Sequence, residues 1–149
     1  MRFALPLVAV ALVAGFSLAA DVDVGLVDQK APKKEDLAPP AKDAKPITVD
    51  LKGTLAGKVT KGEKRNVYFV VCPLGAKGDA GKDWWAQGEV TKDGEAISAD
   101  AQFGEETAGS GEWFAVVAVA TEKKWGVGEK LDSLPADAAF SKVVVVKRK

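Results

Sequence analysis

The apolar run at residues 112–121, Glu-Trp-Phe-Ala-Val-Val-Ala-Val-Ala-Thr, constrains the fold more than any other part of the sequence. It is about half as long as a membrane-spanning helix, and its valines, aromatic residues and flanking glycines favour a β-strand. Successive side chains of a strand point to opposite faces, so Phe114 and Val116 share one face while Trp113 and Val117 share the other. Because both faces are apolar, the sequence predicts a central strand that must be covered on two sides.

Six further segments have the composition or the alternation of strands: residues 47–51, 53–57, 66–72, 83–90, 97–103 and 140–147. Pro73 is expected to end the third of them, because proline cannot donate a hydrogen bond to a neighbouring strand. Asp93-Gly94 predicts a hairpin-type turn. Since no amphipathic helix interrupts the series, the sequence predicts an all-β fold, an antiparallel sandwich of about seven strands over residues 46–149.

The N-terminus has the three parts of a signal peptide. Met1-Arg2 supplies a positive start, residues 3–16 are almost wholly apolar, and Ser17-Leu18-Ala19 supplies small residues at the cleavage site. We expect residues 1–19 to be removed after Ala19, with Ala20 as the second choice and an uncleaved membrane anchor as the alternative. The mature chain is then exported without a membrane span, to the periplasm, the cell surface or the medium.

Residues 20–45 differ in composition from the rest of the chain. They are rich in Ala, Pro, Lys and Asp and contain almost no bulky apolar residue after Val27. Such a segment buries too little apolar surface to offset the entropy of ordering it. The sequence therefore predicts a disordered linker over residues 20–45, followed by one domain.

Composition narrows the range of functions. The 21 basic and 21 acidic residues cancel, so no nucleic-acid partner is expected, and the final Lys147-Arg148-Lys149 is interpreted as a solvated strand end. The absence of histidine removes the commonest general base and metal ligand. Cys72, the single cysteine, is expected to be a small buried side chain, and Glu105-Glu106 to be solvated charge. No catalytic, cofactor-binding or metal-binding residue is predicted, and the chain is expected not to be an enzyme.

The outer face of the central strand needs a cover. We expect the long connection at residues 122–138 to fold back over it, with Trp125 or Leu134 as the covering side chain and one helical turn at residues 134–138. The alternative is that a partner protein covers this face.

Tryptophans supply the candidate binding residues. An exposed indole stacks on sugar rings or anchors a protein interface. Trp84 is assigned to the core by alternation, whereas Trp85 and Trp125 have polar neighbours. Trp85, Gln87 and Trp125 are therefore the candidate contacts for a ligand or partner, although packing against a crossing loop also accounts for the two indoles.

The strand pattern resembles immunoglobulin-like and fibronectin type III domains. The resemblance rests on Trp84 in a main strand, an alternating strand that ends at Phe103, the long strand opened by Phe114 and a valine-rich last strand. The run Trp84-Trp85-Ala86-Gln87 also looks like Ig-like modules of secreted or envelope bacterial proteins. The resemblance implies a sandwich over residues 46–149 and, since both core cysteines of antibody domains are missing, no disulfide between the sheets.

Two classes of function remain open at this point. The first is a non-enzymatic binding or structural module that mediates interaction with an envelope protein through an apolar patch or an unpaired strand edge. The second is a carbohydrate-binding module in which exposed tryptophans stack on a polysaccharide. A small hydrolase is a third, disfavoured class. No cofactor is expected in any of them.

Overall fold

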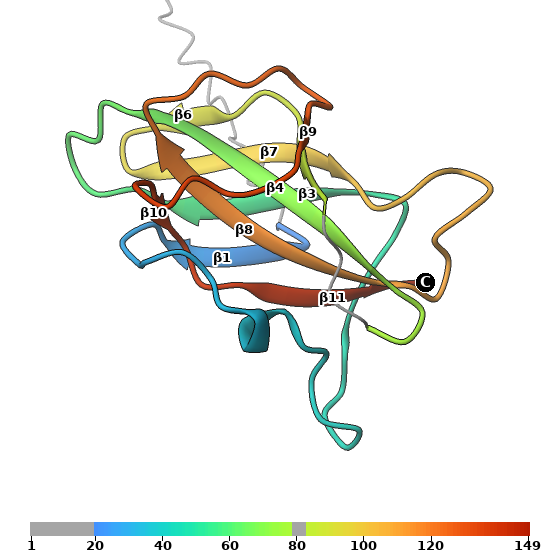
Figure 1. Cartoon of the computed structure of the whole chain (residues 1–149). Helices are drawn as coiled ribbons and strands as arrows, with labels where there is room; N and C mark the ends of the chain where they lie inside the picture. The colour runs from blue at the N-terminus through green and yellow to red at the C-terminus, as the bar shows by residue number, and fades with distance from the viewer. Residues whose placement is uncertain (1–19, 79–82) are drawn as a thin grey trace, which may run out of the picture.

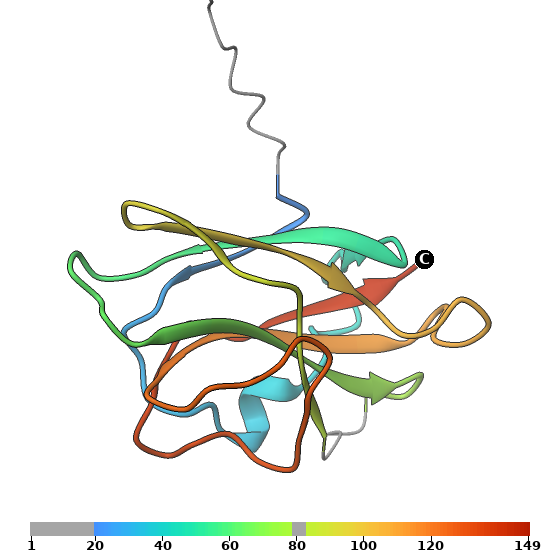
Figure 2. The same ribbon diagram turned by 90° about the horizontal axis from the view of Figure 1, so that it is seen from above.

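The structure is a computed structural model that describes residues 20–78 and 83–149, and these residues form two packed β-sheets (Figure 1). Figure 2 shows the sheets as separate layers. The first sheet has the strand order β1 (Val22–Leu26), β3 (Lys52–Lys58), β7 (Ala96–Gln102) and β6 (Thr91–Asp93). The second has the order β2 (Ile47–Val49), β11 (Val144–Arg148), β8 (Trp113–Thr121), β4 (Asn66–Gly75), β5 (Trp84–Ala86) and β9 (Lys130–Leu131), with β10 (Ala139–Phe140) also paired to β8. The all-β prediction is confirmed.

Strand β8 is the central strand, as its sequence predicts. It pairs antiparallel with β4 along its whole length and with β11 on its other edge. Every residue of β8 except Trp113 is buried. Its two faces contribute to two different hydrophobic clusters.

The inner core lies between the sheets. The first sheet contributes Leu55, Ile97 and other apolar residues, and the second contributes Phe69, Phe114 and Val116. Phe103 and Phe114 meet edge to face, with their ring centroids 5.8 Å apart, a favourable geometry for aromatic rings. All of these side chains except Leu55 belong to alternating sets that the sequence assigns to one face of a strand.

The outer core lies on the opposite face of the second sheet. It is built from buried residues that include Val117, Cys72 and Trp84, and Trp125, Leu134 and Ala138 of the connection pack against it. This confirms that the connection at residues 122–138 covers the outer face. The expected helical turn at residues 134–138 is wrong, because the connection forms β9 and a turn instead.

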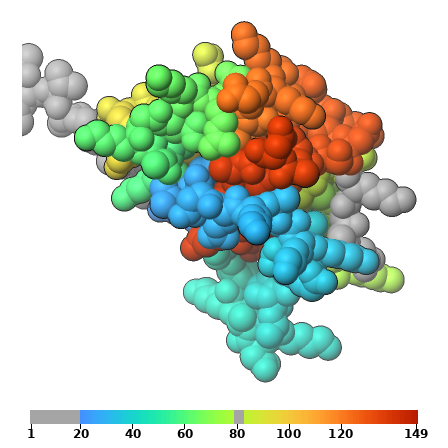
Figure 3. Space-filling view, turned by 60° about the vertical axis from the view of Figure 1, so that its left-hand side comes forward, coloured from blue at the N-terminus to red at the C-terminus, as the bar shows by residue number. Residues whose placement is uncertain are grey.

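A second segment also covers the outer face. The 3₁₀ helix η1 (Lys34–Leu37) carries Leu37, which packs against the outer core, and Figure 1 shows this helix beside β11. Residues 40–45 are exposed, and the chain before β2 projects from the body of the molecule (Figure 3).

The structure therefore departs from the expected linker at residues 20–45. Val22–Leu26 forms β1, which pairs parallel with β3, and Val22, Val24 and Val27 are buried in the inner core. The sequence prediction missed β1 because the alternation Val22-Asp23-Val24 is short. The Ala, Pro and Lys residues that follow it dominate the composition of residues 20–45. The folded unit begins near Asp21 rather than at residue 46. The expected signal peptide, residues 1–19, lies outside the described residues.

Other boundaries differ for local reasons. The predicted strand at residues 47–51 is shorter than expected, because β2 in the second sheet ends at Val49 and the chain then crosses to the first sheet, where β3 begins at Lys52. Strand β4 continues through Pro73, which is paired with Phe114 at an irregularity in the register, so proline does not end it.

The sheets are mixed rather than antiparallel, because β1 with β3 and β2 with β11 are parallel pairs. The described residues thus form eleven strands instead of about seven.

Candidate binding groove

A groove of about 1080 Å³ opens between the two sheets, and we call it the inter-sheet groove. Its wall from the first sheet includes Gly53 of β3 and Ala101 of β7, which face each other in the strand pairing. Its wall from the second sheet includes Pro73 of β4 and Phe114 of β8. Gly53 contributes only backbone to this wall, and Ala101 contributes only a methyl group.

Position 53 must be glycine because the segment before β1 passes close to it. A Cβ atom at this position would lie 2.6 Å from the Asp21 carboxylate. That carboxylate accepts a hydrogen bond of 2.8 Å from the Thr54 N–H, while the Asp21 N–H donates to the Thr54 carbonyl at 3.0 Å. Asp21 is thereby held at the groove, immediately before β1.

Residues 87 and 88 cross from one sheet to the other at the edge of the groove. The Gln87 N–H donates to the carbonyl of Phe69 in β4 at 2.9 Å, and the Gly88 N–H donates to the carbonyl of Asp100 in β7 at 3.0 Å. A Cβ on Gly88 would lie 2.8 Å from that carbonyl oxygen, so a larger residue would push the crossing away from β7. The predicted strand at residues 83–90 consequently ends with β5 at Ala86.

The Gln87 side chain links the two walls. Its Nε2 donates to the Trp85 carbonyl at 2.9 Å, and its Oε1 accepts from the Gln102 N–H at 2.9 Å. The side-chain amide of Gln87 thus accepts a hydrogen bond from the backbone of β7, as the carbonyl of a neighbouring strand would. Both polar ends of Gln87 are engaged within the chain, so this candidate contact shapes the groove and does not present a free amide to a ligand.

Trp85 forms an apolar rim on the groove together with Val127. The indole is 40 % exposed and Val127 is 72 % exposed, while Trp84, on the other face of β5, is buried. The alternation of the sequence predicts this arrangement, with Trp84 buried and Trp85 exposed. However, Trp84 belongs to the outer core and not to the core between the sheets.

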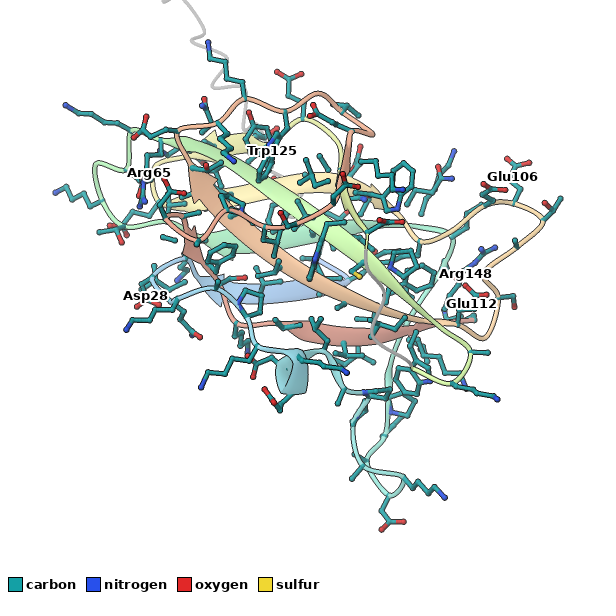
Figure 4. All side chains as sticks on the ribbon, viewed as in Figure 1. Asp28, Arg65, Glu106, Glu112, Trp125 and Arg148 are labelled. Atoms are coloured by element: carbon teal, nitrogen blue, oxygen red, sulfur yellow. The ribbon has the colours of Figure 1, made fainter. Side chains whose placement is uncertain are left out.

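Trp125, labelled in Figure 4, lines a second, smaller hollow of about 200 Å³ that is known from its lining residues. Its indole packs on Tyr68 of β4, with the ring centroids 4.8 Å apart, and it is half-buried. Gln87, Gly88 and Val127 line both the hollow and the groove. The structure therefore brings Trp85, Gln87 and Trp125 to one edge of the sandwich, but only Trp85 presents an exposed ring.

Acidic residues are among those that line the inter-sheet groove. Asp21, Asp100 and Glu105 line it, against the single base Lys52. Within the part of the chain that the structure describes, none of the three carboxylates lies in an ion pair with a basic side chain. Asp100 alternates with the buried Ala99 and Ala101, so its carboxylate points to the outer face of the first sheet, whereas the Asp21 carboxylate is held at the groove by the Thr54 N–H.

Arg148 fixes the loop that carries Glu105. Its Nη1 donates to the carbonyl oxygens of Phe103, Glu105 and Ala108, at 3.1, 2.7 and 2.5 Å. Figure 4 shows Arg148 at the base of this loop. Arg148 is only 8 % exposed, so the expectation of a solvated strand end is wrong for this residue. Composition gave no signal for this role, because the loop and the arginine are far apart in sequence.

The loop follows the arginine closely because two of its residues are glycines. Gly104 and Gly109 have positive φ angles of 83° and 100°, which residues with side chains rarely adopt. A Cβ on either glycine would also lie within about 3.1 Å of Arg148 Nη1. The loop at residues 103–109 is thus ordered around the buried guanidinium of Arg148.

The reactive groups of the described residues are few. Burial raises the pKa of the Cys72 thiol to about 11, with a further contribution from the negative charge of Asp83. Within residues 20–78 and 83–149, no three His, Cys, Asp or Glu side chains are grouped so that they could hold a metal ion. In the same residues, no helix has the length and hydropathy needed to cross a bilayer. The arrangement offers binding contacts: a rigid groove, an exposed indole and carboxylates.

Comparison of the chain with protein-family models, with curated proteins and with solved structures finds no match.

Proposed function

We propose that this chain is an exported, non-enzymatic binding module that holds a protein partner in the inter-sheet groove. The single observation that carries the proposal is the groove of about 1080 Å³ with Trp85 and Val127 exposed on its rim. Ligand sites are concave and combine apolar side chains with a few placed polar groups, and the few residues that dominate binding at protein interfaces are enriched in tryptophan, tyrosine and arginine. The candidate contact Trp85 is the anchor in this proposal.

The strand order supports an Ig-like sandwich as the fold of this module. Ig-like domains have the strand order A-B-E-D in one sheet and C-F-G in the other. Here β1-β3-β7-β6 has the order of the first sheet, and β4-β8-β11 has the order of the second. The parallel pairing of β1 with β3 and the position of Trp84 outside the inner core differ from the Ig pattern.

Export is proposed from the N-terminal sequence. Removal of residues 1–19 leaves a chain whose β1 begins three residues after Ala19, at Val22. The mature protein then acts in the periplasm, on the cell surface or in the medium, and its partner is an envelope protein. Mass spectrometry of the exported protein tests this part, because a chain that still begins at Met1 would contradict it.

A protein partner is favoured over a polysaccharide by the state of the candidate residues. A stacking platform for sugar needs exposed rings, yet Trp125 is half-buried on Tyr68 and the amide of Gln87 is engaged internally. Trp85 alone is exposed among the three. Polysaccharide binding is kept as the alternative result of the test.

The test places a photo-crosslinking amino acid at Trp85 and exposes the protein to envelope extract. The matched control carries the same amino acid at Lys92, an exposed position of β6 that does not line the groove. We expect a discrete crosslinked protein from the Trp85 position alone, and its loss when unlabelled wild-type protein competes. Equal crosslinking from both positions, or retention on insoluble polysaccharide without any protein crosslink, would contradict the proposal.

A further inference from the structure

We propose that the edge of β4 at residues 66–69 accepts an extended peptide segment of the protein partner as an added strand. This site rests on the proposed function and extends it, because the smaller hollow at this edge shares Gln87, Gly88 and Val127 with the inter-sheet groove. The direction of the β4 backbone groups, the course of β5 and two aromatic side chains beside the edge support the assignment.

The backbone groups of Val67 and Phe69 point away from β8. In an antiparallel pair, the N–H and C=O groups of successive residues face opposite edges of the strand. Phe69 lies opposite Ala118 of β8, but the Ala118 carbonyl accepts from the Ser141 N–H at 2.9 Å, on the other side of β8. The Phe69 carbonyl instead accepts from the Gln87 N–H at 2.9 Å. Val67, two residues earlier, therefore faces the same edge as Phe69.

Strand β5 leaves this edge before it reaches Val67. It ends at Ala86, and the Gly88 N–H already donates to the carbonyl of Asp100 in the first sheet. Within residues 20–78 and 83–149, no strand lies beside Val67 on this edge, and its N–H and C=O have no hydrogen-bond partner there. Val67 is only partly buried and lines the hollow, so the edge can be reached. An unpaired strand edge is a template for another chain, and strand addition is a recurring mode of peptide recognition.

Pro73 shows that β4 does not need every backbone donor on this edge. Proline has no N–H, yet β4 continues through Pro73, which lies opposite Phe114. Pro73 and Val67 are an even number of residues apart, so the donor missing at Pro73 is also one that would face away from β8. A proline at position 67 would likewise remove a donor from the free edge and none from the pairing of β4 with β8.

The surroundings of the edge favour a short peptide. Strand β5 has three residues and β9 has two, so this sheet already contains short pairings. Tyr68 and Trp125 pack on each other beside the hollow, and both are half-buried, so a side chain of the added strand can lie against the rings. In strand addition, main-chain hydrogen bonds supply affinity and pockets for alternate side chains supply selectivity. Because the hollow and the groove share lining residues, one peptide can occupy both.

Amide hydrogen exchange measured by NMR tests whether the edge is open. We expect the Val67 N–H to exchange much faster than the N–H groups of Tyr68 and Val70, which face β8. An end-capped peptide of sequence Lys-Thr-Val-Thr-Val-Thr-Lys should slow the exchange of the Val67 N–H. The same peptide with every backbone nitrogen methylated has the same charge and should have no effect. Slow exchange of Val67 in the free protein, or no change with the first peptide, would overturn the proposal.

Two substitutions at position 67 separate main-chain pairing from side-chain packing. V67P removes the free donor, whereas V67A keeps it, and both shorten or alter the apolar side chain. We expect V67P to weaken binding of the peptide about tenfold, as the loss of a main-chain hydrogen bond and its replacement by a ring would do, and V67A to weaken it less than about twofold. Equal effects of the two substitutions would refute strand addition. Circular dichroism checks that each variant keeps its sheets, and the exchange of the wild type decides the question if V67P does not fold.

Capture of the partner by the photo-crosslinking amino acid at Trp85 distinguishes this site from the proposed function. If V67P captures the partner as well as the wild type does, the groove remains a protein site and strand addition is refuted. If the peptide slows exchange at Val67 while the Trp85 position captures no protein, the edge of β4 is supported and the groove is refuted. Loss of capture in V67P but not in V67A supports both.

Discussion

The backbone N–H of Trp125 donates a hydrogen bond of 3.0 Å to the Tyr68 hydroxyl while the two rings pack at a centroid distance of 4.8 Å. One residue of β4 thus holds both the backbone and the side chain of the connection that follows β8. The contact fixes the connection over the outer core and defines one side of the smaller hollow.

Trp125→Ala is expected to lower the free energy of unfolding by about 2 kcal/mol, below the cost of truncating a fully buried tryptophan, because the indole is half-buried. The variant should also bind a dye that recognises exposed apolar surface. Urea unfolding and dye fluorescence measure the two effects. An unchanged midpoint together with loss of a ligand would show instead that Trp125 is a contact residue.

Arg148→Ala is expected to destabilise the protein by about 2 to 3 kcal/mol, because the carbonyls of Phe103, Glu105 and Ala108 lose a charged donor. Hydrogen exchange should increase in the loop that follows β7. The matched control is Lys149→Ala, which removes an exposed ion pair with Asp50 and should cost less than about 1 kcal/mol. Equal losses of unfolding free energy in the two variants would refute the role of Arg148 in holding the loop.

Glu63 gives a prediction about pH. A hydrogen bond from Arg65 holds the pKa of the Glu63 carboxyl at about 2, below its ordinary value of 4.5. A pKa that is lower in the folded protein contributes stability above about pH 4.5, and that stability is lost as the pH falls towards 2. The two residues are neighbours in sequence and the unfolded chain keeps part of the attraction, so the contribution should stay below about 1 kcal/mol.

Thermal unfolding of the wild type and of Glu63→Gln checks this prediction. The wild type should be the more stable at pH 6, and the difference should vanish near pH 2. Arg65→Gln removes the partner and should show the same loss of pH dependence. A wild-type advantage that grows on acidification would have the wrong sign for this ion pair.

Cys72 should resist alkylation in the native protein at pH 8. The thiol is fully buried and its pKa is raised to about 11, so it is neither accessible nor ionised. Iodoacetamide labelling followed by mass spectrometry should detect reaction only after denaturation. A cysteine introduced at the exposed Ser110 should react at once under the same conditions, and fast native labelling of Cys72 would contradict its burial.

Sequence patterns predict which faces of the main strands are buried. Residues 97–103 alternate between apolar and polar side chains, and β7 buries only the apolar set, whereas residues 113–121 are apolar on both faces and β8 is buried on both. The boundaries that differ depend on long-range pairing. Residues 87–90 look like the end of a strand, but they cross between sheets because Asp100, distant in sequence, accepts the hydrogen bond of Gly88.

The candidate site is only partly visible in the sequence. The polar neighbours of Trp85 indicate its exposure, which the structure has. The groove is lined by residues of both sheets, among them Gly53 and Ala101, which oppose each other only after β3 has paired with β7. Arg148 is similarly far in sequence from the carbonyls that it binds. No local pattern reports such contacts.

Val24 tests the largest difference between the expected and the observed fold. It lies in β1, inside the segment expected to be a disordered linker, yet it is fully buried in the inner core. Val24→Asp would place a charge there without a partner, so we expect a loss of at least about 3 kcal/mol and a protein that is largely unfolded at 37 °C. The matched control is Ala44→Asp in the exposed part of the same segment, which should leave stability within about 0.5 kcal/mol of the wild type. If Val24→Asp unfolds at the wild-type urea midpoint, β1 is not part of the domain and the core begins at β2.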